Sequence, residues 1–388
     1  MHREELSAIL TPARFRQREP AEAFSSATIR TTMHLCYYLT SHGFGHSVRA
    51  CAICAHLPEN VHVTFRTGVP QTFFQVECTR PFGYASAAFD CGCLQSDSVT
   101  IDVERTLKTY TAIASRNEAE LAQEIQWIRD NRIDGVICDI PPFPLEAAAR
   151  AGVPSVAVAN FTWHDIYREY LAAYPRYEAL IDKMREQYAA ASLLLEVSPS
   201  LPMPYFGRTV QAGVVGRPGH GMRERMCRLL GIDPQRKLAL LYLGTFGMQM
   251  AWERLRDFSE WAFVSGDTMD PCPQNMFVFD KRDIAYQDVA ASVDVVLSKL
   301  GYGIYSSCLL DGVPLIYLPR HEFAEYAALE AGVEQWGGGV RLSQEQFRSL
   351  EWGDALDAAV SRGRLPAIPD TGARFCADSI VELVKGGH

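Results

Sequence analysis

Long hydrophobic segments are missing from this sequence of 388 residues. A membrane-spanning helix needs about 18 consecutive apolar residues, whereas the longest apolar runs, such as Leu238–Leu243, have only the length of a strand. The N-terminal stretch Met1–Ser26 mixes Arg, Glu and Ala and contains no apolar core of a signal peptide. We therefore expect a cytoplasmic protein without a membrane span.

An excess of positive charge is also missing. The 37 Lys and Arg residues are outnumbered by 46 Asp and Glu, which gives a formal net charge of −9. Proteins that bind nucleic acid normally present a basic face, so we expect no nucleic-acid partner. Low-complexity segments are absent too, and at roughly 100–200 residues per domain the length indicates two or three folded domains.

Paired cysteine motifs are scarce, although the chain contains eleven cysteines. Cys51-Ala-Ile-Cys54 has the spacing of a zinc or redox site, but no second C-x-x-C follows it, and Cys91-Gly-Cys93 is the only other close pair. An odd number of scattered cysteines without a secretory signal indicates reduced thiols. We expect Cys51 and Cys54 to be small buried hydrophobic side chains on a helix.

What the sequence does contain is a regular alternation of short apolar runs and helical patterns. This alternation is typical of parallel sheets that are covered by helices on both faces. Strands are predicted at Met33–Thr40, Val61–Arg66, Asp134–Asp139, Val153–Asn160, Leu193–Val197, Leu238–Gly244, Ala262–Ser265, Met276–Phe279, Val293–Ser298 and Val313–Pro319. Helices are predicted at Ser47–His56, Asp102–Asn131, Pro142–Ala151, Met222–Leu230, Gly303–Asp311, Phe323–Gly332 and Thr371–Lys385.

The alternation breaks once, at the Leu-Pro-Met-Pro sequence of residues 201–204 and the glycines that follow it. Prolines and glycines of this density mark a domain boundary. The fold class we predict is α/β, with two Rossmann-like domains that face a central cleft, where ligands bind outside the carboxyl ends of the strands. The predicted limits are an N-terminal extension at 1–30, Rossmann-like domains at 31–205 and 206–370, and a closing helix at 371–388.

The first predicted strand runs into the loop Ser41-His42-Gly43-Phe44-Gly45-His46, which is followed by a helix. Gly43 and Gly45 permit a tight turn, and His46 at the helix start could accept a proton from a substrate hydroxyl. Asp139 ends another strand and could orient His46. The alternatives are a capping or structural histidine and an N-cap aspartate.

A second glycine loop, Ser298-Lys299-Leu300-Gly301-Tyr302-Gly303, also joins a strand to a helix. Such a turn is a phosphate-binding arrangement, but the spacing matches neither G-x-x-x-x-G-K-[ST] nor G-x-G-x-x-G. A third loop, Gly244-Thr245-Phe246-Gly247, is either a further source of backbone donors or an ordinary turn.

Polar residues end two further strands. Asn160-Phe161-Thr162-Trp163-His164 follows a strand of the first half, and Pro319–Tyr326 follows one of the second half. In the second segment Glu325 could accept hydrogen bonds from sugar hydroxyls; the alternative is a solvated helix start.

Several of these motifs together resemble those of a known group of proteins. The motifs are the Tyr37–His46 loop, Phe89–Asp97, Ala159–Tyr167, Ser298–Gly303 and Gly312–Arg320. They resemble glycosyltransferases of the B-type fold, most closely the glycosyltransferase-like N-terminal region of L-arabinokinases and more distantly MurG-like N-acetylglucosaminyltransferases. The resemblance extends from about residue 33 to about residue 339. Because no kinase segment follows, we expect a stand-alone glycosyltransferase-type protein.

The resemblance implies roles for particular residues. His46 and Asp139 would be catalytic, and Phe279–Ile284 would meet the nucleotide base. The donor and its diphosphate would be bound by Thr245, Phe246, Gly247, Gly301, Tyr302, Gly303, Ser306, Ser307 and Glu325. The acceptor side would contain Gly43, Phe44, Gly45, Asn160, Trp163 and His164.

The resemblance also implies an activity. A nucleoside diphosphate-sugar, foremost a UDP-sugar, would donate a hexosyl or N-acetylhexosaminyl group to a small or medium acceptor, with inversion and without a cofactor or bound metal. Relatives commonly place a glutamate where this chain has Ser307, and Asn-Glu-Glu where it has Ala324-Glu325-Tyr326. The helical region Asp102–Asn131 would either support a homodimer or pack on its own sheet.

Two other functions are compatible with the sequence. One is a nucleotide-sugar binding or regulatory module without transfer activity, which the Ser307 departure favours. The other is a nucleotide-sugar epimerase, for which Glu325 and Glu322 would be the acid–base carboxylates.

Overall fold

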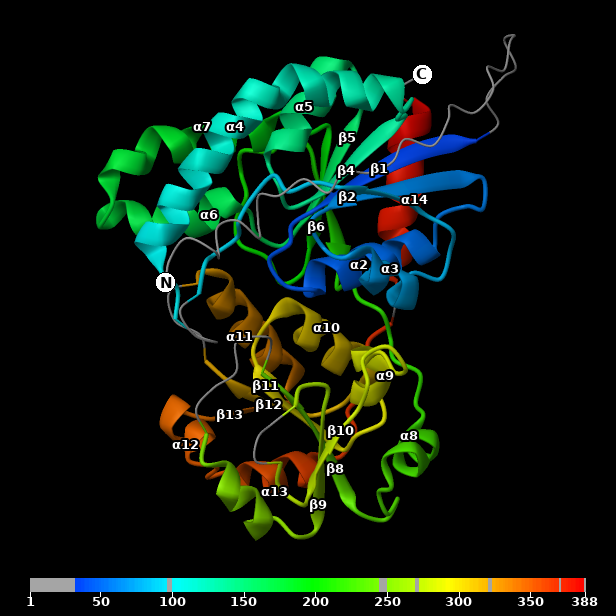
Figure 1. Cartoon of the computed structure of the whole chain (residues 1–388), viewed down its shortest axis with the longest axis vertical. Helices are drawn as coiled ribbons and strands as arrows, with labels where there is room; N and C mark the ends of the chain where they lie inside the picture. Colours follow the sequence, from blue (N-terminus) through cyan, green and yellow to red (C-terminus); the bar gives the residue numbers. More distant parts are fainter. Residues whose placement is uncertain are drawn as a thin grey trace. The chain divides into compact units, whose positions relative to one another are not determined.

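The computed structural model describes residues 32–95, 100–243, 250–268, 272–319, 323–369 and 371–386. They contain two separate sheets, each built only of parallel strands and flanked by helices (Figure 1). This is the predicted α/β class with two Rossmann-like sheets. Residues 1–30, the predicted extension, lie outside the described residues.

The first sheet has seven strands in the order β3-β2-β1-β4-β5-β6-β7. Its strands are β1 (Met33–Leu39), β2 (Val61–Thr67), β3 (Gly83–Ser86), β4 (Gly135–Asp139), β5 (Ser155–Ala159), β6 (Leu193–Val197) and β7 (Thr209–Gly213). The helices of this half are α2 (Gly45–Ala55), α3 (Gln71–Glu77), α4 (Val103–Asp130), α5 (Phe143–Ala151), α6 (Trp163–Arg168) and α7 (Glu178–Ala189). The order reverses at β1 and β4, so the loops that follow these two strands lie at the point where such sheets bind ligands.

The second sheet has six strands in the order β10-β9-β8-β11-β12-β13. Its strands are β8 (Lys237–Tyr242), β9 (Trp261–Ser265), β10 (Met276–Val278), β11 (Val295–Lys299), β12 (Leu315–Leu318) and β13 (Gly339–Arg341). The helices of this half are α8 (Arg223–Leu230), α9 (Tyr286–Ala290), α10 (Tyr302–Asp311), α11 (Glu325–Trp336), α12 (Gln344–Arg348) and α13 (Gly353–Arg362), and α14 (Gly372–Gly386) follows them in the chain. Here the order reverses at β8 and β11.

Every strand predicted from an apolar run is present, whereas β3, β7 and β13 were not predicted. These three strands are edge strands with few fully buried residues, so they lack the continuous apolar run of a central parallel strand. Because β7 pairs with β6, the first sheet continues past the expected limit at residue 205 to Gly213. The domain limits stay predictions.

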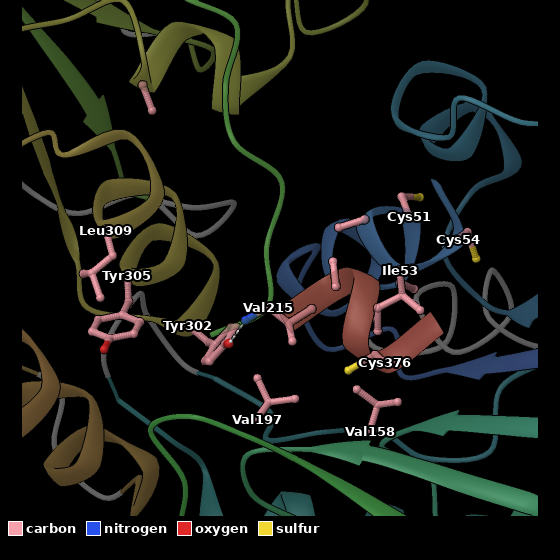
Figure 2. Packing of buried hydrophobic residues seen from close by; sticks show 14 of the residues in the cluster. Cys51, Ile53, Cys54, Val158, Val197, Val215, Tyr302, Tyr305, Leu309 and Cys376 are labelled. Atoms are coloured by element: carbon pink, nitrogen blue, oxygen red, sulfur yellow. Dashed lines mark hydrogen bonds between the residues drawn. The ribbon is translucent and has the colours of Figure 1, made fainter. Parts of the chain in front are cut away.

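The C-terminal helix α14 packs against α2 and β7 of the first half (Figure 1). Its Cys376 belongs to a hydrophobic cluster that also contains Ile53 of α2, Val158 of β5 and Tyr302 of α10 (Figure 2). This cluster is therefore continuous between the two halves. The Val215 amide in the connecting segment donates a 2.9 Å hydrogen bond to the Tyr302 hydroxyl, which fixes the start of α10 against that segment.

Two further expectations concern helices. Cys51 and Cys54 are buried on α2, as predicted, and all eleven cysteines are free. The long helix α4 packs on α5 and buries Leu107, Tyr110 and Ile128; the homodimer stays a prediction. No helix among the described residues is long and apolar enough to cross a membrane.

Candidate active site

His46 and Asp139 meet at the carboxyl edge of the first sheet. Strands β1 and β4 are parallel neighbours with Leu39 opposite Asp139, so the loop after β1 and the end of β4 share one edge. His46 lies in the first turn of α2, and its Nδ1 is 2.8 Å from Oδ1 of Asp139. The Asp139 side chain is completely buried, whereas the His46 side chain keeps 11% of its surface exposed.

The hydrogen bond fixes the tautomer of the imidazole. An ionised carboxylate can only accept, so in the neutral ring Nδ1 of His46 carries the proton and Nε2 keeps its lone pair. Nε2 makes no hydrogen bond within the part of the chain that the structure describes. In its neutral form the ring thus has the orientation and the tautomer of a general base.

Arg49 completes this pair and was not predicted from the sequence. It lies one turn after His46 on α2 and is 2% exposed. Its Nε donates to Oδ2 of Asp139 at 2.8 Å and its Nη2 donates to Oδ1 at 2.6 Å. The available signal was a single charged residue in the mainly apolar helix predicted at Ser47–His56, because a charge that becomes buried there requires a partner.

These contacts decide the charge of Asp139. Burial alone would raise its pKa, but the charges of Arg49 and His46 and their hydrogen bonds outweigh burial and lower it. The carboxylate is therefore ionised at neutral pH and remains a hydrogen-bond acceptor for His46.

Asn160 and Glu325 extend the same group of side chains to the second half. The Arg49 Nη1 donates to Oδ1 of Asn160 at 2.9 Å, and Nδ2 of Asn160 donates to Oε1 of Glu325 at 2.6 Å. Both Asn160 and Glu325 are buried. Asn160 was predicted on the acceptor side and Glu325 at the donor sugar; the structure brings them together, and both roles stay predictions.

The two glycine loops touch at their backbones. A Cβ on Gly303 would lie 3.2 Å from Cα of Gly45, and a Cβ on Gly45 would lie 3.5 Å from N of Gly303. Glycine at position 303 permits this close approach, whereas a Cβ on Gly45 would make only an ordinary contact. The structure therefore places the predicted phosphate loop beside the loop that carries His46.

The other predicted donor residues lie at or near the start of α10. No side chain caps this helix at Gly301, so its first-turn N–H groups have no side-chain cap. Oγ of Ser306 and Oγ of Ser307 both donate to the Gly303 carbonyl oxygen, at 3.1 and 2.9 Å. Both serines are buried, so in this structure their hydroxyls form hydrogen bonds within the helix.

Several predicted residues lie outside the described residues or apart from this group. Thr245, Phe246, Gly247 and Glu322 lie outside the described residues. In the expected base-binding segment, Phe279 and Ile284 are buried in the core. Their contact with a nucleotide base stays a prediction.

The predicted acceptor residues divide into exposed and buried ones. Gly43 has a φ of +82°, and the neighbouring Phe44, 42% exposed, stacks on Phe73 with a centroid distance of 4.9 Å. Trp163 and His164 are buried. Trp163 Nε1 donates to Oδ2 of Asp90 at 2.7 Å, and the His164 ring packs on the Tyr205 ring. Their contact with an acceptor stays a prediction.

Asp90 is a second buried carboxylate near the site. It accepts from Trp163 and, at 2.9 Å, from the Thr40 hydroxyl. Burial raises its pKa to about 6, although both hydrogen bonds act in the opposite direction. Within the described residues no group of three or more His, Cys, Asp or Glu side chains could hold a metal ion.

The sequence of this chain is similar to that of a known protein. No family model matches this chain. An L-arabinokinase of Arabidopsis thaliana is 31% identical over 364 residues, which cover 91% of this chain. The matched part is 34% of that relative, so this chain spans about a third of its length. The predicted resemblance to L-arabinokinases is confirmed.

Solved structures support the fold. MurG of Acinetobacter baumannii is 13% identical, with a TM-score of 0.53 over 90% of this chain and 99% of its own. UGT89C1 of Arabidopsis thaliana, complexed with quercetin, is 12% identical, with a TM-score of 0.58 over 92% and 96%. A putative UDP-N-acetylglucosamine 2-epimerase of Listeria monocytogenes is 11% identical, with the same score and coverage. The chain therefore has the B-type glycosyltransferase fold and is similar, over most of its length, to part of an L-arabinokinase.

Proposed function

We propose that this protein is a glycosyltransferase that moves a sugar from a nucleoside diphosphate-sugar to a hydroxyl group of a small or medium acceptor. UDP-sugar is the proposed donor, and no metal or further cofactor takes part. The observation that carries the proposal is the 2.8 Å contact between His46 and Asp139 beside a loop that offers uncapped helix N–H groups. This combines a proton acceptor with an anion site.

The proposed reaction is a single displacement. The acceptor oxygen attacks the anomeric carbon while its proton passes to Nε2 of His46, and the bond from that carbon to the diphosphate breaks. The leaving diphosphate carries the electron pair away, and backbone donors at the start of α10 offset its charge. Attack from the side opposite the leaving group inverts the anomeric centre.

The first experiment measures thermal stabilisation by UDP, GDP, TDP, ADP and CMP, followed by the corresponding sugars. A ligand at 100 times its Kd adds about 2.7 kcal/mol to the free energy of unfolding. A selective response to one diphosphate names the donor, and transfer is then assayed with that donor against a panel of acceptors. No stabilisation by any of them would contradict the proposal.

The epimerase fold neighbour makes nucleotide-sugar epimerisation the second candidate. That reaction needs an acid–base carboxylate at the sugar, and Glu325 is the described candidate although Oε1 already accepts from Asn160. Isomerised nucleotide sugar without any acceptor would support epimerisation. A binding module without chemistry, the third candidate, would show donor binding but neither transfer nor isomerisation.

A further inference from the structure

The burial of Arg49 has a cost that its surroundings must offset. All residues of α2 from Ser47 to Cys54 are buried, and Arg49 is the charged one among them. Transfer of an ion into a protein interior costs several kcal/mol unless good hydrogen bonds compensate. Three of its five N–H groups have such bonds, two to Asp139 and one to Asn160.

The guanidinium is held by both halves of the molecule. Its Cζ lies 4.9 Å from the centroid of the Tyr302 ring at the start of α10, and the Tyr302 hydroxyl is itself bound by the Val215 amide (Figure 2). Asn160 in turn is bound to Glu325 at the start of α11. A group fixed from so many sides has one orientation available to it.

The same guanidinium lies close to the imidazole. Nη2 of Arg49 is 3.2 Å from Nδ1 of His46, and both atoms point at Oδ1 of Asp139. Since Nδ1 donates its proton to the carboxylate, this contact is an approach of two donors. A positive charge on the ring would face a positive guanidinium at that distance.

We propose that Arg49 is a positioning residue: it fixes the Asp139 carboxylate and opposes a second proton on the His46 ring, so that Nε2 stays open for the acceptor proton. The inference rests on the proposed function, because it assigns His46 as the base. Without Arg49, the carboxylate would attract the second proton with nothing to oppose it.

The charged and titratable groups around His46 come from several elements. Asp139 belongs to β4, Arg49 belongs to α2, and Asp90 lies in the segment between β3 and α4. Phe161 contributes an uncharged ring at a centroid distance of 5.9 Å. Asp90 is unchanged in every variant below, so differences between the variants report Arg49 and Asp139.

The test follows the pH titration of the His46 ring by NMR, with the signal assigned by its loss in His46→Gln. Two pairs are compared: wild type with Arg49→Met, and Asp139→Asn with the double variant Arg49→Met and Asp139→Asn. We expect removal of the guanidinium to raise the titration midpoint by about one pH unit in both pairs. An unchanged or lowered midpoint would overturn the proposal, and the second pair decides if Arg49→Met alone does not fold.

Arg80→Lys is the matched control for a merely structural arginine. Arg80 donates to the carbonyl oxygens of Cys54 and Leu57, both at 2.9 Å, at the far end of the same helix. We expect this variant to lower the melting temperature and to leave the His46 midpoint unchanged. An equal shift in this variant would mean that the midpoint reports general loosening of α2, and would overturn the role assigned to Arg49.

Transfer kinetics supply the second readout. Lysine keeps the charge but cannot hold both carboxylate oxygens and Asn160, so Arg49→Lys should lower kcat by about 10- to 100-fold and weaken donor binding far less. An equal loss of kcat and donor affinity would overturn the positioning role. If wild type transfers no sugar, the proposed function fails, whereas the NMR titration still decides whether Arg49 acts on His46.

Discussion

The two glycine loops that meet at Gly45 and Gly303 are built alike and differ in chemistry. Each joins a central parallel strand to a helix, β1 to α2 and β11 to α10. The first loop leads into His46 and Arg49, which both form hydrogen bonds with the Asp139 carboxylate. The first turns of the helix after the second loop instead carry serines that bond back to the backbone.

This difference separates two tasks. A proton acceptor needs a side chain whose charge is controlled, and the first loop supplies it through buried ion pairing. A site for a diphosphate needs N–H groups at a helix start and space for close approach, and a glycine turn supplies both without any ionisable group. The predictions below test whether each loop performs only its own task.

The largest effect is expected from His46→Ala. Loss of the base should lower kcat by about 10²- to 10⁴-fold, while donor Kd changes by less than about twofold because the donor lies at the other loop. His220→Ala, which removes a histidine with an 83% exposed side chain, is the control and should leave both constants unchanged. Equal losses in kcat and donor affinity would show that the first loop also binds the donor.

The next effect concerns stability and pH. The pKa of Asp90 is raised to about 6 by burial, so the folded protein takes up a proton at a pH where the unfolded chain is still ionised. Its contribution to stability is therefore greatest below about pH 4 and is lost as pH rises through 6, by about 3 kcal/mol. Urea unfolding from pH 4 to 7 should show this slope in wild type. Asp90→Asn should reduce it by the Asp90 share and leave the part due to Asp311, whose pKa burial also raises to about 6. The same slope in both proteins would mean that Asp90 is not the group that titrates.

A smaller effect is expected where the loops touch. Gly303→Ala places its Cβ 3.2 Å from Cα of Gly45, whereas Gly45→Ala meets the other loop only at 3.5 Å and Gly301→Ala meets nothing within 4 Å. Gly303→Ala should lower the free energy of unfolding by about 1 kcal/mol, since crowding exceeds the helix preference of alanine.

The two other glycine variants are the matched controls, and their unfolding free energies should stay within about 0.5 kcal/mol of wild type. Diphosphate affinity then separates the loops. If the second loop binds the diphosphate, the methyl group of Gly301→Ala weakens UDP binding without any loss of stability. Tight UDP binding by this variant would contradict the assignment of that loop.

The smallest effect is expected from Ser307→Ala. Its hydroxyl donates to the Gly303 carbonyl oxygen, a local bond that adds little to helix stability. Donor Kd should change by less than about threefold, as in the Ser306→Ala control. A tenfold loss confined to Ser307→Ala would show that this serine turns toward the donor and replaces the glutamate of the relatives.

The sequence predicted the elements that carry the site with good accuracy. His46 and Asp139 were assigned together because each ends or follows a central apolar strand, and such strands are recognisable from composition alone. The edge strands β3, β7 and β13 were missed because their residues are only partly buried. Arg49 was missed because a helical pattern does not show which side of the helix meets a carboxylate.

What the sequence by itself determined is thus the set of strands, the glycine turns and the pair of residues at one sheet edge, since these depend on local patterns and on the rules of parallel sheets. Only the tertiary structure decided that Arg49 holds Asp139, that Asn160 binds Glu325 across 165 positions of the chain, and that Gly45 touches Gly303. These contacts join segments that no local pattern relates. Their geometry arises from the packing of one continuous core between the two halves.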